Sequence, residues 1–163
     1  MLNDGPFKMH FGHIGGTNWK FVPDILEQYN TLLQCLHGET MESCDVMMLY
    51  RILDSPSQHL FFVAAQGRLV STLQMSLALV HPVSSLHINN VVTLPAYEGR
   101  GHGKQLMNYA TETLAAWYSA KCSRLRLTLT NAPDKGNAGF YEKLGFRART
   151  RDNDAETIVW VKD

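Results

Sequence analysis

Hydrophobic residues in the first third of the chain recur with the spacing of two helices. Over residues 23–37 an apolar side chain returns every three or four positions, and Gly38 follows as a stop signal. The same spacing returns over residues 42–53 and ends at a Ser-Pro-Ser break. Residues 7–14, ahead of both, are expected to form a strand. The pattern therefore predicts one strand followed by two helices.

The middle of the chain changes to the period of two that is typical of strands. Residues 59–65 and 68–81 flank Gln66-Gly67, a pair that favours a hairpin turn. Residues 85–94 follow as another apolar strand. This region is expected to form an antiparallel meander.

The last part of the chain returns to helical spacing and then alternates again. Residues 103–119 predict a helix with Trp117 on its apolar stripe, and residues 123–130 alternate cleanly as a strand. A short helix fits residues 135–144, and residues 156–161 form a last expected strand. Together these elements predict one α+β domain with a mixed sheet.

Composition supports a folded domain and excludes several classes of partner. The 163 residues suit a single domain, with 45% hydrophobic and 18% charged residues. Fifteen basic and fifteen acidic residues cancel, so we expect no general affinity for nucleic acid or for an anionic membrane. No apolar run reaches the roughly 20 residues of a membrane-spanning helix. Four methionines fall within apolar stripes and are expected in the core, namely Met47, Met48, Met75 and Met107.

The cysteines and the N-terminus indicate a reducing compartment. Cys35, Cys44 and Cys122 are odd in number and widely spaced, which fits neither a disulfide framework nor a zinc site. The first residues lack the basic start and apolar stretch of a signal peptide. A cytoplasmic location is therefore expected. His10 and His13 would face opposite sides of a strand, so no metal site is expected there.

The stretch "EGRGHGK", residues 98–104, lies between an expected strand and an expected helix. Glycines at such a junction let an anion approach the N–H groups that converge at a helix start. A nucleoside-triphosphate loop is excluded, because Gln105 stands where a hydroxyl is needed and Glu98 where the first glycine is needed. The dinucleotide fingerprint also fails, since the third glycine comes one residue early. The loop is predicted to hold a different phosphate compound.

A second motif, "NAGFYEKLGF" over residues 137–146, lies about forty residues further on. Together the two segments resemble the GNAT superfamily of acyl-CoA-dependent N-acyltransferases, although that family usually has Gln or Arg where Glu98 stands. The resemblance is sharp over residues 86–146 and architectural before that. It implies a mixed, mostly antiparallel sheet of six to seven strands flanked by about four helices. It also implies strands that are splayed at the acetyl-CoA site.

The resemblance implies acetyl-CoA as co-substrate and no metal. Backbone groups of Val92, Thr93 and Leu94 would pair with the pantetheine arm. The loop that would hold the diphosphate comprises Gly99, Arg100, Gly101, His102, Gly103 and Lys104. The later motif would add contacts from Asn137, Phe140 and Lys143. A helix-capping role for Asn137 is equally open.

Acyl transfer also needs a proton donor for the thiolate and a means of deprotonating the amine. The resemblance assigns the donor to Tyr141. Relatives often place a carboxylate on the strand before the loop, but this chain has Asn89 and Asn90 there, and amides cannot take a proton. His87 is the candidate base, with ordered water as an equal alternative and His81 as a weaker one.

The function expected from the sequence is direct acetyl transfer from acetyl-CoA to a primary amine of a small metabolite or peptide. Cys44 and Cys122 lack any local feature of an activated nucleophile, so no covalent intermediate is expected. Two other possibilities remain open at this point: a degenerate module that binds acyl-CoA without turnover, and a plain nucleotide-phosphate protein. Family habit makes a homodimer plausible.

Overall fold

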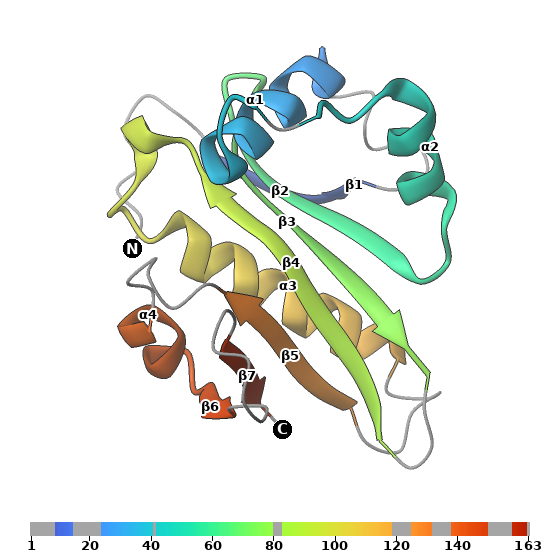
Figure 1. The fold of residues 1–163 in the computed structure, drawn as a ribbon, viewed down its shortest axis with the longest axis vertical. Coiled ribbons are helices and arrows are strands. Elements are labelled where there is room, and N and C mark those ends of the chain that lie inside the picture. Colours follow the sequence, from blue (N-terminus) through green and yellow to red (C-terminus); the bar gives the residue numbers. More distant parts are fainter. Residues whose placement is uncertain are drawn as a thin grey trace. The chain divides into compact units, whose positions relative to one another are not determined.

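The structure is a computed structural model, and it describes residues 9–14, 24–40, 42–79, 83–118, 125–131, 138–149 and 158–162. The class is α+β with a mixed, mostly antiparallel sheet and four helices, as predicted (Figure 1). In chain order the elements are β1 (Met9–Ile14), α1 (Ile25–His37), α2 (Val46–Asp54), β2 (Gln58–Ala65), β3 (Arg68–Ala78), β4 (Ser84–Thr93), the 3₁₀ helix η2 (Pro95–Tyr97), α3 (His102–Tyr118), β5 (Leu125–Asn131), α4 (Ala138–Lys143), β6 (Arg147–Arg149) and β7 (Ile158–Lys162).

The chain divides into two compact units. The first unit comprises Met1–Gln74 and Asn90–Leu114, and the second comprises Met75–Asn89 and Ala115–Asp163. Strands follow the order β1-β2-β3-β4 in the first unit and β3-β4-β5-β7-β6 in the second. The division therefore falls within β3 and within β4, so that each of these strands contributes to both units.

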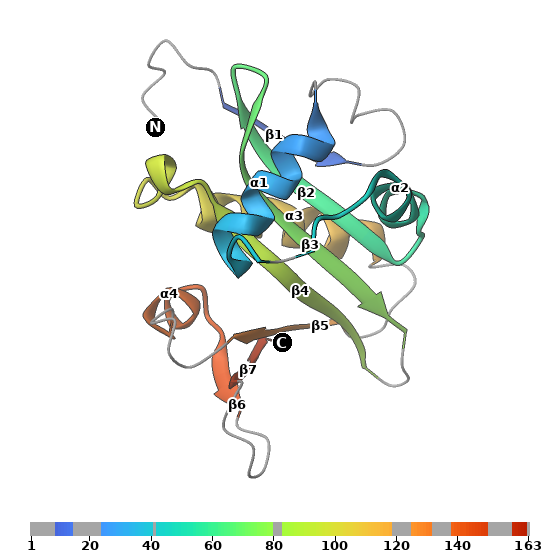
Figure 2. The same cartoon turned by 45° about the horizontal axis from the view of Figure 1, so that its top comes forward.

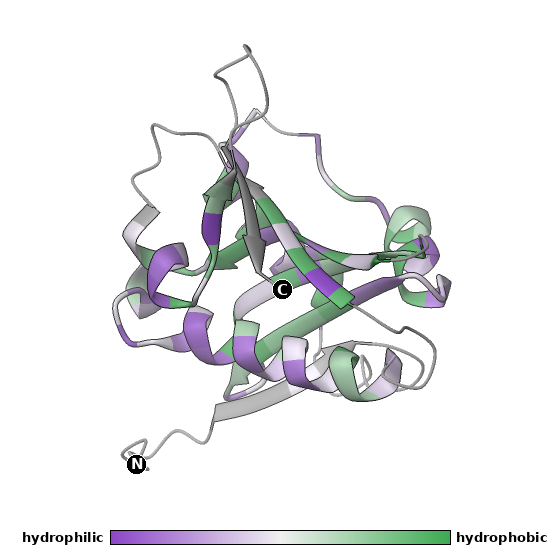
Figure 3. Ribbon diagram, turned by 90° about the horizontal axis from the view of Figure 1, so that it is seen from below, coloured by the Kyte–Doolittle hydropathy of each residue, from purple (hydrophilic) through white to green (hydrophobic). Residues whose placement is uncertain are grey.

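In the first unit, β2 is buried on both faces. It pairs with β1 in antiparallel register from Met9↔Ala65 to Ile14↔Leu60. Side chains alternate along a strand, so successive residues serve opposite faces. Leu60 packs with buried residues of α1, and the ring of Phe61 meets Tyr109 of α3 edge-on at 6.0 Å. Figure 2 accordingly places α1 and α3 on opposite sides of β2. In Figure 3 the coloured strands are mostly green, which marks hydrophobic residues.

The predicted hairpin turn between β2 and β3 is confirmed. Gln66 has φ 52° and Gly67 has φ 73°, and two successive positive values are typical of the tight turns that match strand twist. The side chain of Gln28 on α1 holds this turn, because its Oε1 accepts from Leu69 N at 2.6 Å and its Nε2 donates to Gly67 O at 3.4 Å. The first helix and the hairpin are thereby joined at one end.

In the second unit, β4 and β5 are the parallel pair. Their register runs from Ser84↔Leu125 to Ile88↔Leu129, and β5 pairs antiparallel with β7. Helix α4 ends at Lys143, and Gly145 shortly after it has a φ of 88°, which agrees with the predicted stop. The three-residue strand β6, which pairs with β7, was not predicted because it is too short to show a period.

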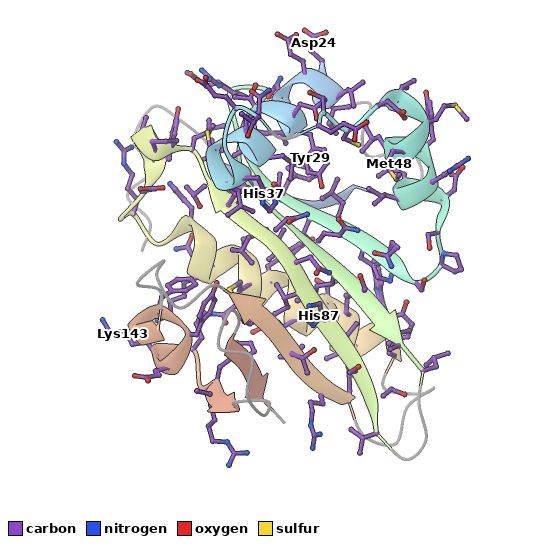
Figure 4. All side chains as sticks on the ribbon, in the orientation of Figure 1. Asp24, Tyr29, His37, Met48, His87 and Lys143 are labelled. Atoms are coloured by element: carbon purple, nitrogen blue, oxygen red, sulfur yellow. The ribbon has the colours of Figure 1, made fainter. Side chains whose placement is uncertain are left out.

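Helix α2 differs from its prediction in both start and packing. It begins at Val46 rather than at residue 42, because Oδ1 of Asp45 caps it by accepting from Met48 N at 2.7 Å. Met47 and Met48 are 60% and 48% exposed, so the expectation that they lie in the core was wrong. Only the face that carries Leu49 packs inward, whereas Met75 and Met107 in other elements are buried as expected. Figure 4 labels Met48 on this helix.

No helix in the described ranges is long and apolar enough to cross a membrane.

Candidate active site

The glycine loop leads directly into α3. The helix begins at His102, and its first bond runs from Gln105 N to Gly101 O at 3.0 Å. Gly99 and Gly101 have φ of 72° and 83°, and a Cβ added at either would meet nothing within 4 Å. The positive φ values therefore favour glycine at both positions, and the space beside each glycine is open. The first N–H groups of a helix lack intrahelical partners, so the geometry of this loop is suited to an anion.

The side chains of the loop contribute unequally to its charge. Lys104 is exposed, and the guanidinium of Arg100 lies 5.4 Å from the centre of the Tyr97 ring. The ring of His102 is 5% exposed, and neither of its nitrogens has a hydrogen-bond partner within the described ranges. Burial, and then the charge of Arg100, lower the pKa of His102, which keeps the ring neutral. His102 can therefore offer an anion its backbone N–H but no charge.

The end of β4, just before the loop, is held against β3 at alternate residues. Leu94 N donates to Val70 O at 2.8 Å, and Val92 O accepts from Ser71 Oγ at 2.8 Å. Backbone groups of successive strand residues point to opposite sides, so those of Thr93 point away from β3. Of the three residues predicted to pair with pantetheine, Thr93 is the one whose backbone is directed to the other edge.

Strand β4 continues well beyond its pairing with β5. The last parallel pair is Ile88↔Leu129, whereas β4 runs on to Thr93. Within this extension, Asn90 has a left-handed φ of 51°. Asn tolerates this conformation better than most residues, yet inside a strand it interrupts the alternation. Such strained positions are concentrated at functional sites.

The side chain of Asn90 connects two residues of α1 that the sequence did not single out. Its Oδ1 lies 3.0 Å from Nε2 of His37, the last residue of α1. It is also hydrogen-bonded to Tyr29, which is 2% exposed and whose pKa is raised to about 12, chiefly by burial. Figure 4 labels Tyr29 and His37 on the same helix. Their partner lies more than fifty positions away in sequence, so no local spacing could have predicted the cluster.

His87 lies in the second unit as part of a cross-strand pair. Its Nδ1 is 2.8 Å from Thr128 Oγ1, and the two residues are register partners on β4 and β5. The ring is half-buried, and this burial lowers its pKa. The neighbouring amide of Asn89 donates to Ser76 Oγ at 3.2 Å. The arrangement makes His87 a neutral imidazole fixed by a strand neighbour.

The later motif is packed around its tyrosine. Tyr141 is 7% exposed, and its ring meets Phe140 at 5.3 Å and Phe146 at 6.3 Å, both edge-on. Burial raises the pKa of the phenol, so it remains protonated at neutral pH. Lys143 is exposed, while Asn137 lies outside the described residues, as do His81 and Cys122.

The described cysteines do not carry the features of a nucleophile. Burial, followed by the charge of Asp45, raises the pKa of the Cys44 thiol, which disfavours the thiolate. Cys35 is a free and exposed thiol. Among the described residues, no group of three or more His, Cys, Asp or Glu side chains could hold a metal ion.

Residues 57–148 match the family model of the acetyltransferase (GNAT) domain, which is more than half of the chain. The chain belongs to the GNAT acetyltransferase family. The matched range runs from β2 to α4 and into β6, and therefore contains the glycine loop and the Tyr141 motif. The resemblance drawn from these two motifs is thus confirmed. Membership supports an acyl-transferring enzyme in general.

Solved structures share this GNAT fold. A putative acetyltransferase from Agrobacterium tumefaciens is 25% identical, with a TM-score of 0.68, 90% of this chain covered and 97% of the other. Arabidopsis thaliana NAA60 in complex with acetyl-CoA is 12% identical, with a TM-score of 0.71 and coverage of 95% and 98%. An aminoglycoside acetyltransferase from an uncultured soil metagenomic sample is 13% identical, with a TM-score of 0.72 and coverage of 90% and 93%. No curated protein matches the sequence.

Proposed function

We propose that this GNAT protein transfers an acetyl group from acetyl-CoA to a primary amine. The observation that carries the proposal is the loop before α3, where Gly99 and Gly101 combine positive φ with open space at a helix N-terminus. That geometry suits the diphosphate of coenzyme A, which would meet N–H groups and the charges of Arg100 and Lys104. The similarity to NAA60 in complex with acetyl-CoA supports this donor.

The pantetheine arm is proposed to follow the end of β4. Thr93 directs its backbone away from β3 and is the main candidate to pair with a pantetheine amide. Leu94 is a weaker candidate, because its N–H is already bonded to Val70 O at 2.8 Å. Val92 is also a weaker candidate, because its carbonyl accepts from Ser71 Oγ at 2.8 Å and its backbone therefore faces β3. An extended amide chain satisfies strand groups as an added strand does, which is also the reason to propose a splay between strands here.

The acid of the reaction is proposed to be Tyr141. Its phenol remains protonated, and a proton donor must have its proton to give when the thiolate leaves. Phe140, Lys143 and Asn137 are proposed coenzyme contacts by the family motif alone. His87 is retained as a candidate base, with ordered water as its alternative.

The acceptor is proposed to be an amine of a small metabolite or a peptide. The similarity to an aminoglycoside acetyltransferase solved in complex with sisomicin supports an amine-bearing small molecule, but at 11% identity only the fold carries over. The proposal treats residues 1–163 as one N-acetyltransferase domain that acts in the cytoplasm without a metal. A homodimer is part of the same proposal, and sedimentation equilibrium tests it.

Two measurements test the proposed function. Isothermal titration with coenzyme A, ATP and NAD should show a clear preference for coenzyme A, and a preference for ATP or NAD would overturn the assignment of the loop. Thiol release from acetyl-CoA is then followed with a polyamine, an amino sugar, an aminoglycoside and peptides with a free α-amino group. Acetylation of at least one amine is expected. Binding of coenzyme A without turnover on any amine would identify a binding module instead.

A further inference from the structure

Asn90 is held in an unfavourable backbone conformation by bonds that its side chain makes. Two other non-glycine residues have positive φ in the described ranges: Asp24 precedes a helix and Gln66 lies in a hairpin turn, so neither is inside a strand. Asn90 has φ 51° within β4 and only three residues before Thr93. A left-handed conformation is unfavourable for residues other than glycine and persists only where the surroundings impose it. Here the surroundings are Tyr29 and His37.

The bonds of Asn90 fix the orientation of its amide. Its Oδ1 is the atom that faces Nε2 of His37, at 3.0 Å. The amide N–H₂ is then left for the phenol oxygen of Tyr29, and this bond lowers the pKa of Tyr29. An amide oxygen can only accept, so Nε2 of His37 carries the proton. In the neutral ring the lone pair is then on Nδ1.

The other nitrogen of His37 remains available. The side chain is exposed at the C-terminal end of α1, and no described residue makes a hydrogen bond to its Nδ1. Tyr29 is buried and stays neutral, so the amide between them is anchored on the interior side. The arrangement is that of an oriented histidine: one ring nitrogen is bonded to a fixed group, and the side chain as a whole is exposed.

We propose that His37 is the catalytic base that takes the proton of the acceptor amine, and that Asn90 is its positioning residue. This inference rests on the proposed function, because it uses the pantetheine arm along Thr93. A thioester that continues beyond Thr93 along β4 reaches the stretch that contains Asn90. The amides of Asn89 and Asn90 cannot accept a proton, so His37 takes this role.

The step balances as follows for a neutral amine. As the nitrogen bonds to the thioester carbonyl carbon, its proton passes to Nδ1 of His37. The carbon–sulfur bond breaks, and its electron pair leaves with sulfur, which takes a proton from the acid. The imidazolium of His37 then gives its proton to water, and water returns one to the acid. The products are the N-acetyl amide and coenzyme A thiol.

The test uses the full chain and the most active amine of the panel described above. His37→Gln keeps a hydrogen-bond donor but cannot take the proton, and we expect its turnover to fall about 100-fold. The affinity for coenzyme A should stay within about twofold, because His37 lies outside the proposed coenzyme contacts. His37→Ala should be as slow, and added imidazole should restore part of its rate. A merely structural role would give no rescue.

Two further variants sharpen this test. Asn90→Gly keeps the left-handed backbone and removes the amide, so turnover should fall about tenfold without rescue by imidazole. Cys35→Ser is the matched control, because Cys35 is exposed on the same helix and residues two apart do not share a face. Its turnover should equal that of the wild type.

Each result decides the inference. Wild-type turnover in His37→Gln overturns it, and so does imidazole rescue of His87→Ala in place of His37→Ala. If the wild-type chain acetylates no amine, the proposed function fails and this inference fails with it. An active wild type with an active His37→Gln removes the inference alone.

Discussion

His37 and His87 each bond a side chain of a neighbouring element, but they lie in different surroundings. Nε2 of His37 meets Asn90 Oδ1 at 3.0 Å, and the ring is exposed at a helix end. Nδ1 of His87 meets Thr128 Oγ1 at 2.8 Å within a pair of register partners, and the ring is half-buried. The first bond orients a ring that is exposed to solvent. The second bond links the side chains of two neighbouring strands. Hydrogen bonding alone therefore does not decide which of the two histidines is the base.

The glycine loop and the Tyr141 motif also lie in different surroundings, one open and the other packed. In the first unit, Gly99 and Gly101 leave open space beside a backbone with positive φ. In the second unit, Tyr141 is packed between Phe140 and Phe146, and α4 ends in a regular glycine stop. Substitutions in the loop should therefore act mainly on binding, and their effect on folding should come from the positive φ of the glycines. Substitutions around Tyr141 can act on both, so they must be conservative to report on chemistry.

The largest expected effect comes from Tyr141→Phe, which removes the hydroxyl and keeps the ring. If Tyr141 is the acid, turnover should fall by about 100-fold or more, while the affinity for acetyl-CoA stays nearly unchanged. Steady-state kinetics and calorimetric titration measure the two quantities. Comparable kinetics in variant and wild type would remove Tyr141 from the acid role and leave it as a packed residue.

A pair of glycine variants compares the two motifs directly. Gly101 has φ 83°, so Gly101→Ala should be strained by about 1–2 kcal/mol and lower the affinity for coenzyme A about tenfold. Gly139 lies in α4 with nothing within 4 Å of an added Cβ and should accept Ala, with up to about 1 kcal/mol gained from helix propensity. Titration calorimetry and urea unfolding measure these effects. Equal losses of affinity in the two variants would contradict the distinction between the motifs.

The smallest expected effect is on the pH dependence of stability. Burial lowers the pKa of His87 in the folded chain, so below its unfolded value of about 6.5 the unfolded state binds more protons. Its contribution is thus fully present above that pH and is lost as the pH falls. His87→Gln should flatten the decline in the free energy of unfolding between about pH 7.5 and about pH 5.5. A decline as steep as in the wild type would mean that His87 does not titrate in this way.

Local patterns predicted those parts of the fold that depend on neighbours in sequence. The hairpin at Gln66-Gly67, the end of α4 shortly before Gly145 and the loop before α3 each depend on a few adjacent residues, and all three were found. The exposed positions of Met47 and Trp117 were missed, because hydrophobicity does not say which side of a helix meets a partner. Tertiary packing decides that side.

In the candidate site, too, the features that depend on adjacent residues were predicted and those that depend on distant residues were not. The glycine loop was predicted from spacing, since its geometry follows from backbone conformation at Gly99 and Gly101. The cluster of Tyr29, His37 and Asn90 was not, because it joins one helix to a strand more than fifty residues later through side chains. The left-handed φ of Asn90 marks this cluster, and a backbone angle is visible only in a structure.

The most direct test of the central claim is a crystal structure of the chain with coenzyme A. We expect the diphosphate to lie within hydrogen-bonding distance of the N–H groups from Gly101 to Lys104, with a pantetheine amide against the backbone of Thr93 and the thiol directed toward Asn90. A coenzyme that is bound away from this loop, or a pantetheine arm that leaves β4 before Thr93, would contradict the account.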